Sequence, residues 1–330
     1  MGLVLVLTLI AFLAAANGSN DVPKGVATLV GAGVTNYRVA ILWGTAATLV
    51  GCVVSLTLAT RMTALFSTGI VSVAPTTEFT IAVLVGTTGW VAVATLLRLP
   101  VSTTHALVGS LVGAGTMLAA DSVRWSALLP KVVQPLLSSV LAAYAVSAAL
   151  AALGRVRRRR VDVPGSARAD VARGRVVDAI VGRAHWATSG LASFARGLND
   201  TPKIVAIGAA ALVPAGFATW HILVVVTVAM AVGSLAGGLR IAKRLAEDVV
   251  TMSHREGFTA NLTTAALVGV GAWAGLPMST TQVSTGAIAG SAGTAVRRIN
   301  GKTVRQFAIA WIVTPPFAGT VAALIFLVLR

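Results

Sequence analysis

The chain has 330 residues, of which 56% are hydrophobic and only 11% are charged. Because charged residues make up about 25% of an ordinary soluble protein, this composition excludes a water-soluble globule. The formal net charge of +16 would suggest a nucleic-acid partner in a soluble protein. Here the basic residues lie mostly between apolar runs, as in membrane proteins, so we expect no nucleic-acid partner. The sequence therefore predicts an all-α polytopic membrane protein with roughly 10 to 12 helical segments.

The first half of the chain consists of apolar segments separated by polar motifs. The first segment runs to Ala16 and is expected to break at 17–24, because Pro23 frees a backbone carbonyl. Further apolar helices are predicted at about 39–58, 79–97 and 132–153. A shorter segment at about 102–120 cannot span the ~30 Å hydrocarbon core, which favours a re-entrant half-helix.

An arginine-rich stretch divides the chain into two parts of similar length. Residues 154–184 contain nine arginines and separate a first transmembrane repeat at 1–153 from a second at 185–330. Since basic loop residues set membrane orientation, we interpret 154–184 as a cytoplasmic linker. No basic residue precedes Lys24, which predicts an external N-terminus. The protein is expected in the cell membrane as a multi-pass protein.

Two polar motifs occur once in each half, in the same order. The sequence GSNDVPK at 18–24 recurs as GLNDTPK at 197–203, and PVSTT at 100–104 recurs as PMSTT at 277–281. This duplication is typical of secondary transporters built from inverted repeats with broken helices. The segment at 240–252 is more basic than its counterpart at 61–73, which supports inversion. Both segments resemble amphipathic helices at the membrane interface.

Two carboxylates lie between long apolar stretches on both sides, Asp21 and Asp200. A carboxylate inside the membrane costs at least ~2.5–3.5 kcal/mol and normally marks an ion pathway or has a partner. One interpretation is a structural ion pair with Lys24 or Lys203, three residues further on. The other is a coupling-cation site, since Asn and Asp oxygens with freed carbonyls suit a cation such as sodium. The predicted cation ligands are Asn20, Asp21, Asn199 and Asp200.

The Ser-Thr-Thr motifs favour a site of the opposite charge. Proline followed by Ser and Thr is typical of a helix start, where unpaired N–H groups and the helix dipole attract anions. The alternative is an ordinary capped helix whose hydroxyls serve only the backbone. The predicted oxyanion ligands are Ser102, Thr103, Thr104, Ser279, Thr280 and Thr281. The glycines that follow at 109, 113, 286 and 290 are interpreted as packing positions between helices.

Together, the paired Gly-x-Asn-Asp and Pro-x-Ser-Thr-Thr motifs resemble those of the inorganic phosphate transporter (PiT) family. The resemblance covers both halves and implies inverted repeats, a homodimer, and phosphate moved with Na⁺ or H⁺ and no other cofactor. It assigns Asn20, Asp21, Asn199 and Asp200 to the coupling cation and the two Ser-Thr-Thr motifs to phosphate. The chain departs from the family pattern at Pro23 and Lys24, and at Arg196, which replaces a usual histidine.

The leading functional hypothesis is cation-coupled phosphate uptake by alternating access. Phosphate is favoured over sulfate because a protonated phosphate can donate a hydrogen bond to Asp21 or Asp200. A permease for sulfate or another tetrahedral oxyanion is the alternative within this class. A channel or a non-transporting membrane regulator is an alternative of a different class. An enzyme is not expected, because no nucleophile or metal cluster stands out among the few acids and histidines.

Overall fold

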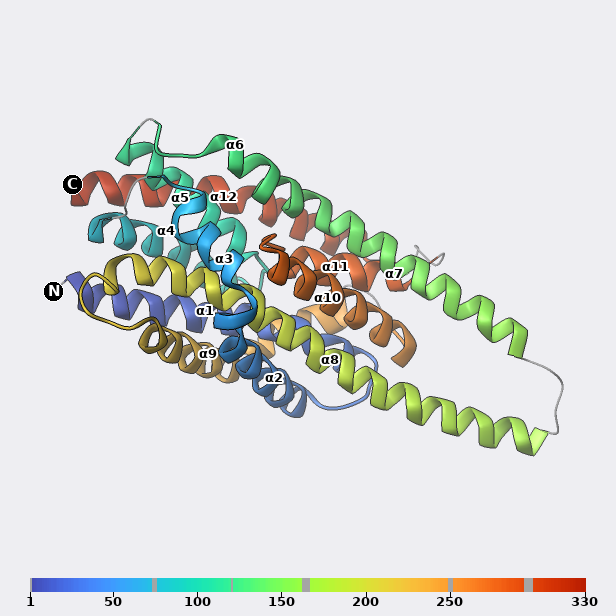
Figure 1. The fold of residues 1–330 in the computed structure, drawn as a ribbon. Helices are drawn as coiled ribbons and strands as arrows, with labels where there is room; N and C mark the ends of the chain where they lie inside the picture. Colours follow the sequence, from blue (N-terminus) through green and yellow to red (C-terminus); the bar gives the residue numbers. More distant parts are fainter. Residues whose placement is uncertain (1, 73–75, 120, 162–166, 249–251, 294–298) are drawn as a thin grey trace.

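A computed structural model describes residues 2–72, 76–119, 121–161, 167–248, 252–293 and 299–330. The described residues are almost entirely helical and contain no β-strand, only a single β-bridge between Val71 and Val123 (Figure 1). The α-helices are α1 (Gly2–Gly31), α2 (Tyr37–Leu58), α3 (Thr60–Ala64), α4 (Thr77–Leu96), α5 (Thr103–Leu118), α6 (Trp125–Leu128), α7 (Gln134–Val161), α8 (Ala167–Leu212), α9 (Thr219–Asp248), α10 (His254–Ala274), α11 (Thr280–Ser291) and α12 (Gly301–Leu329). Two π-helical turns, η1 (Leu65–Gly69) and η2 (Leu129–Val133), follow α3 and α6.

The distribution of side chains is that of a membrane protein. Within the described residues, six helical runs are long and apolar enough to cross a bilayer. Large apolar side chains such as Leu141, Ile312 and Val328 are exposed on the outside, whereas many polar side chains are fully buried. Continuous exposed apolar surface of this kind is rare in soluble monomers and fits contact with lipid. The prediction of an all-α polytopic membrane protein is therefore confirmed.

The predicted breaks in the first helix of each half are wrong. Helix α1 continues through the Asn-Asp motif and Pro23 to Gly31, and α8 continues through Pro202 to Leu212. Proline removes one hydrogen-bond donor but leaves the rest of the helical ladder intact. In an apolar environment an unwound segment would leave further backbone groups without partners, which favours the continuous helix. The Asn and Asp side chains therefore project from helical backbone.

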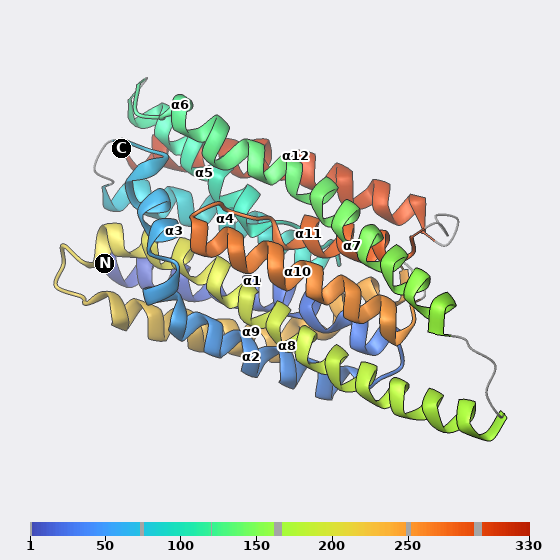
Figure 2. The ribbon, with the colours of Figure 1, turned by 45° about the vertical axis from the view of Figure 1, so that its right-hand side comes forward.

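The arginine-rich stretch is largely helical and not a loop. Helix α7 extends to Val161 and α8 begins at Ala167, while 162–166 lie outside the described residues. Both helices project beyond the others at one end of the molecule (Figures 1 and 2). Alanine and arginine are strong helix formers, so a polar composition does not end a helix here.

The segments interpreted as interfacial helices also differ from expectation. Residues 240–248 are the last part of α9, not a separate helix, and 249–251 lie outside the described residues. In the first half, the counterpart is short, consisting of α3 and η1. The long apolar stretch that precedes Arg240 allows one helix to continue into the basic segment.

The two Ser-Thr-Thr motifs begin short helices, as predicted. Helix α5 has 16 residues and α11 has 12, too few to cross a ~30 Å hydrocarbon core at 1.5 Å per residue. Their N-terminal ends touch, since Thr281 at the start of α11 donates a hydrogen bond to the Val101 carbonyl beside α5 (2.6 Å). From this contact α5 extends towards the end of the molecule that carries the termini, and α11 towards the opposite end (Figures 1 and 2).

The halves pack against each other in a reciprocal pattern. Helix α1 packs on α9 and α8 packs on α2, while α5 packs on α12 and α11 on α7. Glycines permit the last two contacts, because a Cβ at Gly109 or Gly113 would collide with α12 backbone. A Cβ at Gly286 or Gly290 would likewise collide with α7 backbone. The predicted packing role of these glycines is confirmed, and the close contacts hold the two short helices in place.

Candidate functional site

A buried polar cluster lies where α1, α5, α8 and α11 meet. It contains every residue that the sequence predicted for the cation and oxyanion sites, and each is at most 3% exposed. The two Asn-Asp motifs come from α1 and α8, and the two Ser-Thr-Thr motifs come from the starts of α5 and α11. The tertiary structure thus brings together four stretches that are far apart in the sequence.

Asp21 is held by three neighbours from two helices. The Asn17 amide donates to Oδ2 (2.6 Å), and the Thr103 hydroxyl donates to the same oxygen (3.0 Å). The Lys24 ammonium forms an ion pair with Oδ1. This carboxylate therefore has partners on both oxygens, which offsets much of the cost of burying its charge.

Asp200 has a similar but looser set of partners. Its Oδ1 accepts hydrogen bonds from the Asn199 amide (2.7 Å) and the Lys203 ammonium (3.2 Å). Its Oδ2 lies 3.5 Å from the Asn17 amide nitrogen, which thereby links both aspartates. The ion pairs that the sequence suggested as an alternative, Lys24 with Asp21 and Lys203 with Asp200, are both present.

Each lysine also reaches the Ser-Thr-Thr motif of the other half. Lys24 donates to the Thr281 hydroxyl and to the Val101 carbonyl (2.9 Å), and Lys203 donates to the Thr104 hydroxyl (2.7 Å). Each ammonium is thus surrounded by the oxygen types that would ligate a sodium ion. In this conformation the lysines occupy the positions beside the two aspartates.

The serines of the two motifs act as helix caps. The Ser102 hydroxyl accepts from the His105 backbone N–H (3.3 Å), and the Ser279 hydroxyl accepts from that of Gln282 (3.2 Å). Each cap leaves the serine O–H free to donate elsewhere. The capped-helix interpretation is therefore correct for these oxygens, and it is compatible with a ligand at the helix start.

The asparagines next to the aspartates contact the end of α4 and the loops that precede the short helices. Asn20 donates to the Thr95 hydroxyl and the Leu99 carbonyl, both at 3.0 Å, and Asn199 donates to the Met278 carbonyl (3.1 Å). Their amide oxygens are buried and have no hydrogen-bond partner. Two acceptor oxygens therefore remain for a ligand that the polypeptide does not supply.

Two residues of the cluster were not predicted, Asn17 and Arg196. They occupy equivalent positions in the two repeats, at the same offset of 179 residues as the Asn-Asp motifs. Both are fully buried, and the Arg196 guanidinium donates to the Ser284 hydroxyl (3.1 Å). The repeat alignment could have identified them, because it places two strongly polar residues one turn before the motif.

The charges of the cluster do not cancel. The ionised forms of Asp21 and Asp200 contribute two negative charges, and Lys24, Lys203 and Arg196 contribute three positive charges. These groups lie on α1 and α8 and are close enough to interact electrostatically between the two helices. A buried cluster with one surplus positive charge is a favourable site for an anion.

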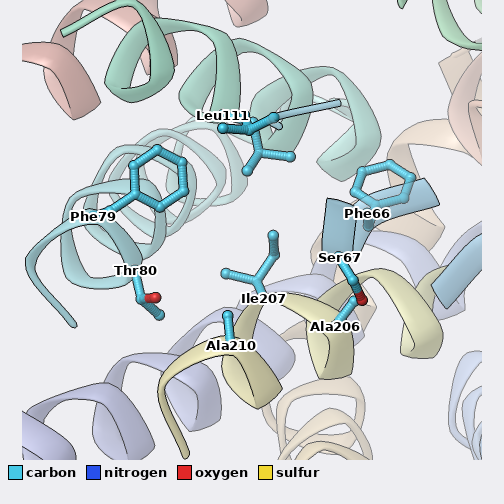
Figure 3. A pocket seen from close by; sticks show the side chains of 9 residues that line it. Phe66, Ser67, Phe79, Thr80, Leu111, Ala206, Ile207 and Ala210 are labelled. Atoms are coloured by element: carbon cyan, nitrogen blue, oxygen red, sulfur yellow. The ribbon is translucent and has the colours of Figure 1, made fainter. Parts of the chain in front are cut away.

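A separate pocket lies outside this cluster, between η1, α4, α5 and α8 (Figure 3). Its walls are mainly apolar, from Phe66, Phe79, Leu111 and Ile207, with the hydroxyls of Ser67 and Thr80 at its edge. None of the predicted site residues lines it. A pocket with these walls lacks the charged donors that a small oxyanion requires.

The part of the sequence that forms this buried cluster matches a known protein family. Residues 17–322, which include both pairs of motifs, match the sequence model of the phosphate transporter family. The chain belongs to the phosphate transporter family. The family consists of transporters, so the expectation that the chain is not an enzyme is confirmed.

Individual phosphate transporters are similar to this chain over most of their length. A "Probable low-affinity inorganic phosphate transporter" of Mycobacterium leprae is 30% identical, over 97% of this chain and 76% of its own length. A protein of the same description from Mycobacterium tuberculosis (strain ATCC 25618 / H37Rv) is 31% identical over the same shares. A solved structure titled "The sodium-dependent phosphate transporter" has the same fold, with a TM-score of 0.86 and 21% identity. That likeness covers 99% of this chain and 98% of the other.

Proposed function

We propose that this protein is a secondary active transporter that takes up inorganic phosphate by alternating access, coupled to sodium ions or protons. The observation that carries the proposal is the convergence of both Asn-Asp and both Ser-Thr-Thr motifs in one buried cluster. Cross-half hydrogen bonds of Lys24 and Lys203 join these motifs. The descriptions of the mycobacterial relatives as inorganic phosphate transporters support phosphate as the substrate.

The anion site of this proposal is the pair of facing helix starts. Helices α5 and α11 both direct their N-terminal ends, with unpaired backbone N–H groups and positive dipole ends, towards the cluster. The hydroxyls of Ser102, Thr103, Thr104, Ser279, Thr280 and Thr281 add donors at the same place. Tetrahedral oxyanions suit such helix starts.

The cation site of this proposal consists of the oxygens of Asn20, Asp21, Asn199 and Asp200. The lysines now beside the aspartates would have to move for a sodium ion to bind to both carboxylates. If the coupling ions give the transported complex a net positive charge, its inward movement is favoured by about 2.3 kcal/mol per charge for each 100 mV of membrane potential. The membrane potential would then drive uptake of an otherwise repelled anion.

Alternating access is supported by the closed state of the cluster. The site residues are at most 3% exposed, so phosphate can enter or leave only after the packing around them opens. The reciprocal contacts of the two halves fit inverted repeats that move relative to each other. In this arrangement the N-terminus is external, residues 154–184 are cytoplasmic, and two copies form a homodimer.

Two other functions make different predictions. A sulfate permease would use the same helix starts but gain nothing from acceptor carboxylates, because sulfate carries no proton to donate. A channel or a non-transporting regulator would not couple solute movement to an ion gradient. The two aspartates in the cluster favour a protonated oxyanion, and hence phosphate, over sulfate.

The decisive experiment is uptake of labelled phosphate into proteoliposomes containing the purified protein, with sodium and pH gradients imposed separately. We expect accumulation against the phosphate gradient under at least one imposed gradient, and weak competition by sulfate. Exchange of internal for external phosphate would separate a carrier from a channel. Transport of sulfate without phosphate, or no uptake under either gradient, would contradict the proposal.

A further inference from the structure

Arg196 is a buried guanidinium with unused hydrogen-bond donors. Its side chain is 1% exposed and is among the largest fully buried side chains of the described residues. One terminal nitrogen donates to Ser284, but Nε and the other terminal nitrogen have no hydrogen-bond partner. An arginine in an apolar interior is normally paired and fully hydrogen-bonded, because burying its unpaired donors is costly.

The two aspartates of the cluster do not hydrogen-bond to this arginine. Lys24 and Lys203 each form an ion pair with one aspartate, Asp21 and Asp200 respectively. Arg196 interacts with both carboxylates only through longer-range electrostatic attraction, and it repels Lys24. It is therefore the cation that brings the surplus positive charge to the cluster.

The arginine also breaks the symmetry between the repeats. Its equivalent in the first half is Asn17, whose amide nitrogen donates to Asp21 and Thr103 and lies 3.5 Å from a carboxylate oxygen of Asp200. When the two Ser-Thr-Thr motifs are aligned, Ser284 on α11 corresponds to Leu107 on α5. Among these equivalent positions, a guanidinium and a hydroxyl are hydrogen-bonded only in the second half, where Arg196 on α8 contacts Ser284 on α11. A third polar group nearby in the sequence, the Thr285 hydroxyl, is buried there without a partner.

We propose that Arg196, together with Ser284, binds the transported oxyanion, and that the anion therefore lies between the two helix starts but closer to the start of α11 than to that of α5. This inference rests on the proposed transport function and identifies a ligand outside the repeated motifs. Nε and the unpartnered terminal nitrogen each carry N–H groups that can donate a charge-assisted hydrogen bond to an oxyanion oxygen. A singly charged anion neutralises the surplus charge of the cluster.

The test compares the wild type with Arg196→Gln, Arg196→Lys and Ser284→Ala in proteoliposomes, with Arg124→Gln as the matched control on an exposed arginine. Initial rates over a range of phosphate concentrations give KM and the maximal rate separately. Thermal denaturation with and without phosphate gives binding without transport. We expect Arg196→Gln to raise KM about tenfold or more and to lose the phosphate-induced stabilisation, since charged hydrogen bonds are lost.

Arg196→Lys keeps the positive charge but has fewer hydrogen-bond donors at different positions, so it should raise KM less than Arg196→Gln does. Ser284→Ala should raise KM a few-fold. If Arg196→Gln does not fold, the lysine and alanine variants decide the question. Unchanged KM and unchanged stabilisation by phosphate in the folded variants would overturn the proposal. Absence of phosphate uptake by the wild type would instead overturn the proposed function, so the two failures are distinguishable.

Discussion

The ammonium of Lys203 on α8 lies 2.7 Å from the hydroxyl of Thr104 at the start of α5, and Lys24 on α1 bonds in the same way to Thr281 at the start of α11. These two hydrogen bonds join opposite halves of the chain inside the cluster. Each lysine is also paired with the aspartate one turn before it. A movement of one repeat against the other must therefore rearrange charged hydrogen bonds, which ties the conformation of the halves to what the cluster binds.

The first prediction concerns the buried aspartates. We expect Asp21→Asn and Asp200→Asn to lower coupled phosphate uptake at least about tenfold, because each removes a carboxylate from the proposed cation site and leaves a buried lysine unpaired. Uptake into proteoliposomes measures the effect, and Glu78→Gln at an exposed position is the control.

The double variant Asp21→Asn with Lys24→Met separates function from stability. It removes both charges of the ion pair, so the folded state no longer contains an unpaired lysine. If Asp21 served only as a structural partner, this double variant would restore uptake. We expect the protein to regain thermal stability and to remain inactive in transport.

The second prediction concerns the threonine hydroxyls. Thr104→Val and Thr281→Val keep the side-chain shape but remove the acceptors of Lys203 and Lys24. We expect both to raise the phosphate KM about tenfold or more, because a hydrogen bond to a charged group is worth about 1.5–3 kcal/mol. The control is Thr57→Val on the exposed surface of α2. Normal kinetics in both variants would remove the oxyanion assignment of the motifs.

The third prediction concerns sodium. Lys24 contacts carboxylate, carbonyl and hydroxyl oxygens, which is the environment a sodium ion would take. Lys24→Met vacates that environment and leaves Asp21 without its counter-charge, so residual uptake should become more dependent on external sodium than in the wild type. Uptake in sodium chloride and in choline chloride measures the difference. A sodium response equal to that of the wild type would show that the ammonium does not compete with the ion.

The fourth prediction concerns the packing of α5 on α12. A Cβ at Gly109 would collide with the Pro315 backbone, so Gly109→Ala should destabilise the protein by about 1–3 kcal/mol and lower its Tm. Gly89 lies in α4 with open space around its Cβ position, so Gly89→Ala should leave Tm equal or higher. Equal Tm values for the two variants would mean that α5 can shift without cost.

Much of the fold could be predicted because its signals are local. Apolar runs predicted the bounds of α2 and α4 to within two residues, and Pro-x-Ser-Thr-Thr predicted the starts of α5 and α11. The end of α1 was not predicted, because the helix continues through the Asn-Asp motif and Pro23. Composition could not show where helices end within polar sequence, so α7 and α8 extend into the arginine-rich stretch and α9 continues past Arg240. Helix propensity and neighbouring apolar sequence, rather than charge, decided those boundaries.

By itself, the sequence determined that the protein is an all-α membrane protein with duplicated motifs, because hydropathy, repeats and helix caps depend on residues close together in the chain. Only the tertiary structure decided that Lys24 reaches Thr281, that Asn17 links the two aspartates, and that Arg196 keeps unused donors. These relationships depend on how helices from opposite halves pack against each other at glycine contacts. Neither hydrophobic periodicity nor motif spacing predicts which side chains meet across that interface.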